Sequence, residues 1–212
     1  MTQRCLIIAA SPERDTAYVR RYAAEADCII CADGGYAKAC ALGIVPDLVI
    51  GDFDSGRMPE AGIEVQRLPK EKDDVDAQAC VQEAVRRGYT DIVVVCASGG
   101  RADHYFCNVL LTEYAARLGA RCMVADGNNR IMLHPGGTVR YPTDRAYRYV
   151  SLVPLDRTVT GVTLRGMKYP LQDAALQRDH IISISNEAQE AQFEITVGEG
   201  RVLVIFSKDV SV

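Results

Sequence analysis

Glycine and acidic residues gather in four short segments whose residue types suit phosphate and metal chemistry. The segments are residues 33–35 (DGG), 51–55 (GDFDS), 72–76 (KDDVD) and 99–104 (GGRADH). Glycine lets the backbone approach a ligand closely, and carboxylates hold Mg²⁺ together with phosphate oxygens and water. Positive side chains and the free N–H groups of a helix start bind phosphate. This combination predicts charge-stabilised phosphoryl transfer.

The spacing inside these segments indicates how carboxylates could share one cation. Asp52 and Asp54 are two residues apart across a turn, and Asp73 and Asp76 are one helical turn apart. Each segment also has a structural explanation, because Asp-Gly-Gly is a common turn and an aspartate such as Asp73 or Asp103 suits a helix N-cap. The functional interpretation therefore requires that all four segments meet at one place.

Three of the segments directly follow runs of mostly apolar residues, and such runs are typical of strands buried on both faces of a parallel sheet. The apolar runs are residues 5–10, 28–32, 47–51, 63–69, 91–97 and 121–126. Because the carboxyl ends of parallel strands form the ligand crevice of an open α/β sheet, we expect the acidic loops to lie together there.

Helical patterns alternate with these strands. We expect one helix from Ser11-Pro12 through Ala26, a second over residues 74–87 and a third over residues 103–118. Such alternation predicts an N-terminal three-layer α/β domain with a mainly parallel sheet, over residues 1–132. Residues 133–212 instead contain short strand-like runs separated by glycine and proline turns, which predicts a smaller all-β sandwich domain.

Composition excludes several classes of function. The chain has 212 residues, a formal charge of −4 and no long basic run, so we expect no nucleic-acid partner. It contains no apolar stretch of membrane-spanning length and no signal-peptide pattern, so we expect a cytoplasmic protein that does not enter a membrane. The eight cysteines are expected to be reduced and mostly buried. The sequence also lacks a P-loop, a dinucleotide-binding glycine motif and a nucleophile elbow.

The glycine-rich and acidic segments, in their order along the chain, resemble the motifs of the thiamin pyrophosphokinase family. The resemblance covers both halves of the chain and is carried by residues 32–35 (ADGG), 46–55 (PDLVIGDFDS), 72–76 (KDDVD), 99–108 (GGRADHYFCN), 161–172 (GVTLRGMKYPLQ) and 183–187 (SISNE). It implies an enzyme that transfers the diphosphoryl group of ATP to the hydroxyl of thiamin, giving thiamin diphosphate and AMP. It also implies Mg²⁺ and a homodimer with sites at the subunit interface.

The resemblance assigns roles to individual residues. Those implied for Mg²⁺ are Asp52, Asp54 and Asp76, and those implied for catalysis are Lys72, Asp73, Arg101 and Asp103. Those implied for nucleotide are Asp33, Gly34, Gly99, Gly100, His104 and Asn108, and those implied for thiamin are Ser185 and Asn186. Either Asp73 or Asp103 is expected to accept the proton of the thiamin hydroxyl.

Two positions depart from the family pattern. Val75 stands where the family usually has threonine, and Ala188 stands where members often have a bulky residue. The chain has no tryptophan, so stacking on the thiamin rings would come from a tyrosine or phenylalanine, with Tyr169 a candidate. Two other functions fit the same residues: a diphosphokinase for another small alcohol such as a pterin, and a sensor that binds thiamin or nucleotide without turnover.

Overall fold

The computed structural model describes residues 3–13, 15–53, 58–69, 76–180 and 182–209. The chain forms two compact units, Met1–Gly127 and Asn128–Val212. The first unit combines a parallel sheet with helices, and the second contains only strands among its described residues. The expected fold class is therefore confirmed.

The first unit is built on six parallel strands in the order β4-β3-β2-β1-β5-β6. Their bounds are β1 Arg4–Ile8, β2 Cys28–Ala32, β3 Leu48–Gly51, β4 Glu64–Arg67, β5 Asp91–Val95 and β6 Arg121–Ala125. The chain adds β2, β3 and β4 on one side of β1 and then crosses back to place β5 and β6 on the other. The order thus reverses between β1 and β5, which is where open α/β sheets bind ligands.

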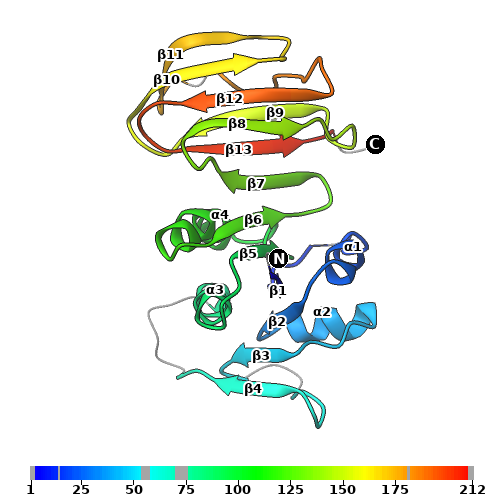
Figure 1. The fold of residues 1–212 in the computed structure, drawn as a ribbon. Helices are drawn as coiled ribbons and strands as arrows, with labels where there is room; N and C mark the ends of the chain where they lie inside the picture. The colour runs from blue at the N-terminus through cyan, green and yellow to red at the C-terminus, as the bar shows by residue number, and fades with distance from the viewer. Residues whose placement is uncertain (1–2, 14, 54–57, 70–75, 181, 210–212) are drawn as a thin grey trace. The chain divides into compact units, whose positions relative to one another are not determined.

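Helices cover both faces of this sheet (Figure 1). Helices α1 (Val19–Ala24) and α2 (Gly35–Leu42) pack on the face that carries Leu6 and Ile8. Helices α3 (Asp76–Arg86) and α4 (Ala102–Arg117) lie on the other side (Figure 1). Since side chains alternate along a strand and both faces are covered, the inner strands β1, β2, β3 and β5 are mostly apolar and buried. The edge strand β4 is instead polar and largely exposed, so the expectation of a strand buried on both faces does not hold for residues 63–69.

Two helices differ from the sequence expectation. The first begins at Val19 and not at Ser11, because the Ala9 and Ser11 N–H groups donate to Val95 O and Cys96 O, both at 2.9 Å, and so extend the chain beside β5. Helix α2, between β2 and β3, was not predicted at all, since its eight residues are too few for a clear periodic pattern.

The second unit is a sandwich: antiparallel strands in the order β7-β13-β9 form one layer, and a four-stranded antiparallel sheet in the order β11-β10-β12-β8 forms the other. The bounds are β7 Asn129–Leu133, β8 Gly137–Pro142, β9 Tyr149–Pro154, β10 Thr158–Arg165, β11 Leu171–Gln177, β12 Gln192–Val197 and β13 Val202–Ser207. One apolar core takes side chains from both sheets, including Leu152 and Val204 from the first and Leu164 and Ile195 from the second.

The helices of the described residues include none that is long and apolar enough to cross a membrane. All eight cysteines are free thiols, and most of them are buried as expected, whereas Cys107 is exposed on α4.

Candidate functional site

A pocket of about 460 Å³ lies at the carboxyl ends of β1 and β5, where the strand order reverses. This volume is in the range of small-molecule sites. Its walls come from the segments after β1 and β5, from Ala32 at the end of β2 and from the first two turns of α3 and α4. The predicted residues that line it are Asp76, Gly99, Gly100, Arg101, His104 and Asn108. Residues far apart in the sequence therefore meet at one edge of the sheet.

Other predicted residues lie outside this pocket or outside the described part of the chain. Asp33, Gly34, Asp52 and Asp103 are described but do not line this pocket. Residues 54 and 72–73, which hold predicted metal and catalytic side chains, are outside the described residues, as is the unusual Val75.

Ser11 and Pro12 line the pocket, although sequence reasoning placed them in a helix. Their position directly after an apolar strand was the signal that could have found them.

The loop after β5 has an unusual backbone and is held by a side chain of α4. Cys96, Gly99 and Gly100 have φ angles of 54°, 82° and 72°, in the left-handed region. The Asn108 Nδ2 group donates to Ala97 O at 2.8 Å, and Asn108 is buried. Asn108 thus fixes the loop that presents Gly99 and Gly100 to the pocket.

The ends of β2 and β3 contact each other beside this pocket. The Asp33 N–H donates to Ile50 O at 2.7 Å, and a Cβ placed on Gly51 would lie 2.7 Å from the Asp33 Cβ. Asp33 and Phe53 have φ angles of 21° and 59°, which are uncommon for residues other than glycine. Such conformations cost about 1–3 kcal/mol each and are concentrated at functional sites.

Gly35 explains why the Asp-Gly-Gly segment contains two glycines. Gly34 is the N-cap of α2, and Gly35 is its first residue. A Cβ on Gly35 would lie 2.0 Å from Ile8 O and 3.1 Å from Ala9 O, so only glycine lets α2 begin against the end of β1. Gly35 therefore has a packing role, which sequence reasoning did not assign.

Arg101 and Asp103 form an exposed pair at the start of α4. Arg101 Nε donates to Asp103 Oδ1 at 3.1 Å, and the His104 N–H donates to the same oxygen at 2.9 Å. The bond from Arg101, with help from His104, lowers the pKa of Asp103 to about 2. A carboxylate with this pKa is a weak base at neutral pH, which argues against Asp103 as the proton acceptor.

The donor chemistry of the acidic segments suits a hard divalent cation. Asp76 lines the pocket, and Asp52 directly follows the end of β3. Among the residues that the structure describes, no group of three or more His, Cys, Asp or Glu side chains could hold a metal ion. Because the predicted ligand Asp54 is outside that part of the chain, the predicted magnesium set stays a prediction.

In the second unit, Ser185 and Asn186 lie in an irregular segment that pairs with β9. Ser185 has a φ of 56°, and its N–H donates to Ser151 Oγ at 2.9 Å. The buried Asn186 side chain holds the backbone of Tyr169: Oδ1 accepts from Tyr169 N at 2.9 Å, and Nδ2 donates to Tyr169 O at 2.8 Å. Tyr169 itself is 58% exposed. Asn186 therefore determines where this exposed ring is presented.

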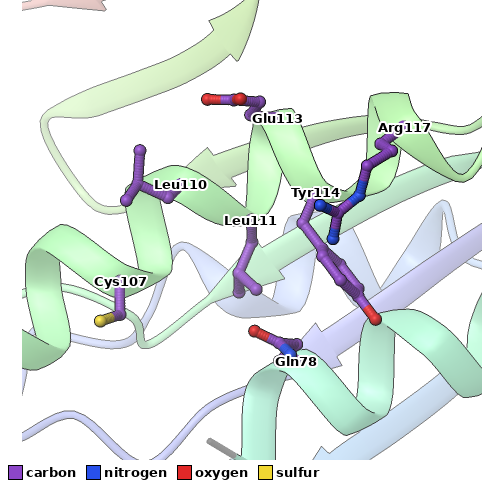
Figure 2. Close-up of a pocket in the computed structure, with 7 residues that line it drawn as sticks. All are labelled: Gln78, Cys107, Leu110, Leu111, Glu113, Tyr114 and Arg117. Atoms are coloured by element: carbon purple, nitrogen blue, oxygen red, sulfur yellow. The ribbon is translucent and has the colours of Figure 1, made fainter. Parts of the chain in front are cut away.

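A second hollow, of about 270 Å³, lies between α3 and α4 (Figure 2). The Arg117 guanidinium lies 5.1 Å from the centre of the Tyr114 ring on its wall. The hollow contains none of the residues selected from the sequence, and the described side chains around it offer no set of groups that would carry out a reaction.

Comparison with known proteins supplies independent evidence for both units. Residues 19–124 match the model of the thiamin pyrophosphokinase catalytic domain, and residues 137–202 match the model of the thiamin pyrophosphokinase vitamin B1 binding domain. Thiamine pyrophosphokinase of Bacillus subtilis is 27% identical over 209 residues, which cover 96% of this chain and 98% of the relative.

Solved structures show the same similarity. The crystal structure of thiamine pyrophosphokinase from Bacillus subtilis has a TM-score of 0.90 at 26% identity and covers 98% of this chain and 100% of that one. The corresponding enzyme from Geobacillus thermodenitrificans has a TM-score of 0.88 at 30% identity, with 99% of each chain covered. Because the two domain models together match most of the sequence, this chain belongs to the thiamin pyrophosphokinase family, which is a family of enzymes.

Proposed function

We propose that this protein transfers the diphosphoryl group of ATP to the hydroxyl oxygen of thiamin, giving thiamin diphosphate and AMP. The observation that carries the proposal is the pocket at the β1–β5 reversal, which brings Asp76, Arg101 and the Gly99-Gly100 loop together. The family match over both units supports the assignment of thiamin as the acceptor.

The reaction requires little covalent chemistry from the protein. The thiamin oxygen attacks the β-phosphorus, the bond from that phosphorus to the oxygen bridging it to the α-phosphate breaks, and AMP leaves with this oxygen. Catalysis then depends on orientation and on stabilising charge as it shifts between oxygens.

Residues of the pocket would hold the triphosphate. Gly99, Gly100 and Arg101 all line the pocket, so the glycine N–H groups and the Arg101 guanidinium would bind phosphate oxygens there. Asp103 orients that guanidinium through their ion pair. His104 and Asn108 line the same pocket, and Asp33 and Gly34 lie in the neighbouring loop after β2. We assign all of these to the nucleotide end of the site.

The carboxylates of Asp52, Asp54 and Asp76 would hold Mg²⁺. When bound, the ion would neutralise charge on the diphosphoryl group. Lys72 would add positive charge beside the start of α3. Of the two candidates that the family resemblance offers, we assign the proton of the thiamin hydroxyl to Asp73, because the Asp103 carboxylate already accepts hydrogen bonds from Arg101 and from the His104 N–H.

The second unit would supply the thiamin end of the site through Ser185, Asn186 and the exposed ring of Tyr169. The match of this unit to the vitamin B1 binding domain supports that assignment. The family resemblance also supports a homodimer, which size-exclusion chromatography with light scattering would test: a mass of one chain would contradict it.

One assay separates the three candidate functions. The protein is incubated with ATP, Mg²⁺ and either thiamin or a hydroxymethyl pterin, and AMP is measured. AMP formed with thiamin but not with the pterin supports the proposal. AMP formed with the pterin supports a diphosphokinase for another alcohol, and tight binding of thiamin without release of AMP supports a sensor.

Asp54→Asn tests the metal assignment. Removing one carboxylate that holds the ion is expected to lower turnover at least ~100-fold, the scale of one lost transition-state contact. A variant that keeps near-normal turnover at saturating Mg²⁺ would show that Asp54 is not a ligand.

A further inference from the structure

Glu13 lies between β1 and α1, and its carboxylate contacts the loop that follows β5. Its Oε1 accepts hydrogen bonds from Ser98 N and Ser98 Oγ, both at 2.9 Å. Its Oε2 accepts from the Tyr18 hydroxyl at 2.6 Å. The side chain is half-buried, and neither the sequence motifs nor the pocket lining include it.

These bonds tie down both ends of the turn that leads into the glycine loop. The Cys96 N–H donates to the Tyr18 hydroxyl at 3.0 Å, and Ser98 is held by Glu13 directly. Burial raises the pKa of Tyr18, which keeps its hydroxyl protonated and able to donate to Glu13. Glu13 and Tyr18 therefore hold one side of the turn, while Asn108 holds Ala97 from the other.

The loop needs such anchors because its backbone is strained. Cys96 has a positive φ, and strained residues persist only where the surrounding structure holds them. The segment that carries Glu13 also touches the loop, since a Cβ on Gly100 would lie 2.9 Å from the Pro12 ring. Glu13 thus links two chain segments, after β1 and after β5, that both line the pocket.

We infer that Glu13 is a positioning residue that sets the Ser98–Arg101 loop in the geometry that receives the triphosphate. The inference rests on the proposed function for the identity of the ligand. Three donors share the charge of this carboxylate, so it can lie near an anionic ligand without a large repulsion. Glu13 has no contact of its own with the reacting atoms in this role.

Two substitutions separate position from charge. Glu13→Ala removes all three bonds, and we expect the Kd for ATP and the KM for ATP to rise about tenfold, the effect of losing one hydrogen-bonded charge. Glu13→Gln keeps an oxygen for Ser98 and offers an N–H to the Tyr18 oxygen, so it should restore affinity to within about threefold of the original. The KM for thiamin should stay within about twofold in both variants.

Glu25→Ala is the matched control, because it removes a carboxylate bonded to Arg4 at 2.7 Å in the same unit, at the C-cap of α1. It should lower thermal stability only slightly, because surface ion pairs contribute little, and it should leave the Kd for ATP unchanged. ATP binding is measured by calorimetry and the two KM values by AMP release.

The inference is overturned if Glu13→Ala binds ATP as tightly as the unmodified protein, or if it raises both KM values equally. A Glu13→Gln variant as weak as Glu13→Ala would also overturn it, since charge and not position would then matter. Failure of the proposed function is a different result: the unmodified protein would release no AMP with thiamin, while the calorimetry would still report on Glu13.

Discussion

Replacing Gly35 by alanine should destabilise the first unit far more than the same change at its neighbour Gly34. The added methyl group on Gly35 would lie 2.0 Å from Ile8 O and 2.9 Å from Ile8 C, which are backbone atoms of a central buried strand. The methyl group on Gly34 would meet only the Cβ of exposed Ala10, at 3.2 Å. The two variants thus add the same atoms in very different surroundings.

The expected magnitudes follow from these contacts. Overpacking costs about 1–3 kcal/mol, and a contact with a rigid strand backbone belongs at the upper end of that range. Gly34 has a φ of −61°, which alanine adopts readily, so Gly34→Ala should change stability by less than about 1 kcal/mol. For a chain of this size about 3 kcal/mol corresponds to a loss of roughly 6–12 °C in Tm.

Thermal unfolding followed by helical circular dichroism measures this difference. All helices of the described residues belong to the first unit, so the helical signal reports on that unit. The Tm of Gly34→Ala is the reference for adding a methyl group without a clash against the strand backbone. The KM of the same variant for ATP tests the nucleotide role proposed for Gly34. A Gly35→Ala variant with the Tm of the Gly34→Ala variant would refute the argument that α2 begins against the end of β1.

Two further substitutions test other parts of the structure. Asn186→Ala should raise the KM for thiamin about tenfold and leave the KM for ATP unchanged, because Tyr169 loses the hydrogen bonds that hold its backbone. A variant with the same KM for thiamin as the unmodified protein would show that the position of the Tyr169 ring does not affect thiamin binding. The bond from Arg86, with a second from Arg87, lowers the pKa of the buried Glu83 to about 2 from an ordinary value of 4.5. Its contacts therefore stabilise the fold above about pH 4.5 and are lost as the pH falls toward 2, so Glu83→Gln should cost about 1.5–3 kcal/mol at neutral pH, with a difference in urea unfolding that shrinks on acidification. A difference that is the same at pH 7 and pH 3 would contradict this assignment.

Much of the first unit could be predicted from local sequence. The apolar run over residues 28–32 coincides with β2, and the other runs fall on their strands to within a few residues. The inner strands are recognisable because both of their faces are covered by apolar contacts, whereas the edge strand β4 is polar and largely exposed. Helix α2 could not be predicted in the same way. It is short, and its position depends on the packing of Gly35 against β1, which involves residues distant in the sequence.

The start of α1 shows a similar limit. Ser11 and Pro12 have the local signature of a helix start, but the backbone of Ser11 bonds to Cys96 instead. That partner is far along the chain, and local propensity contains no information about it. The same applies to Glu13, whose bonds to Ser98 join two segments that only the folded sheet brings together.

The sequence by itself determined the class of fold, the family and the acidic and glycine-rich loops, because strand periodicity and motif order are local properties of the chain. Tertiary structure alone decided which of those residues face the pocket. It turned the side chains of Asn108 and Asn186 toward the backbone of neighbouring loops. These outcomes depend on strand order and on contacts between distant segments, and a polar side chain takes the hydrogen-bond partner that folding places within its reach.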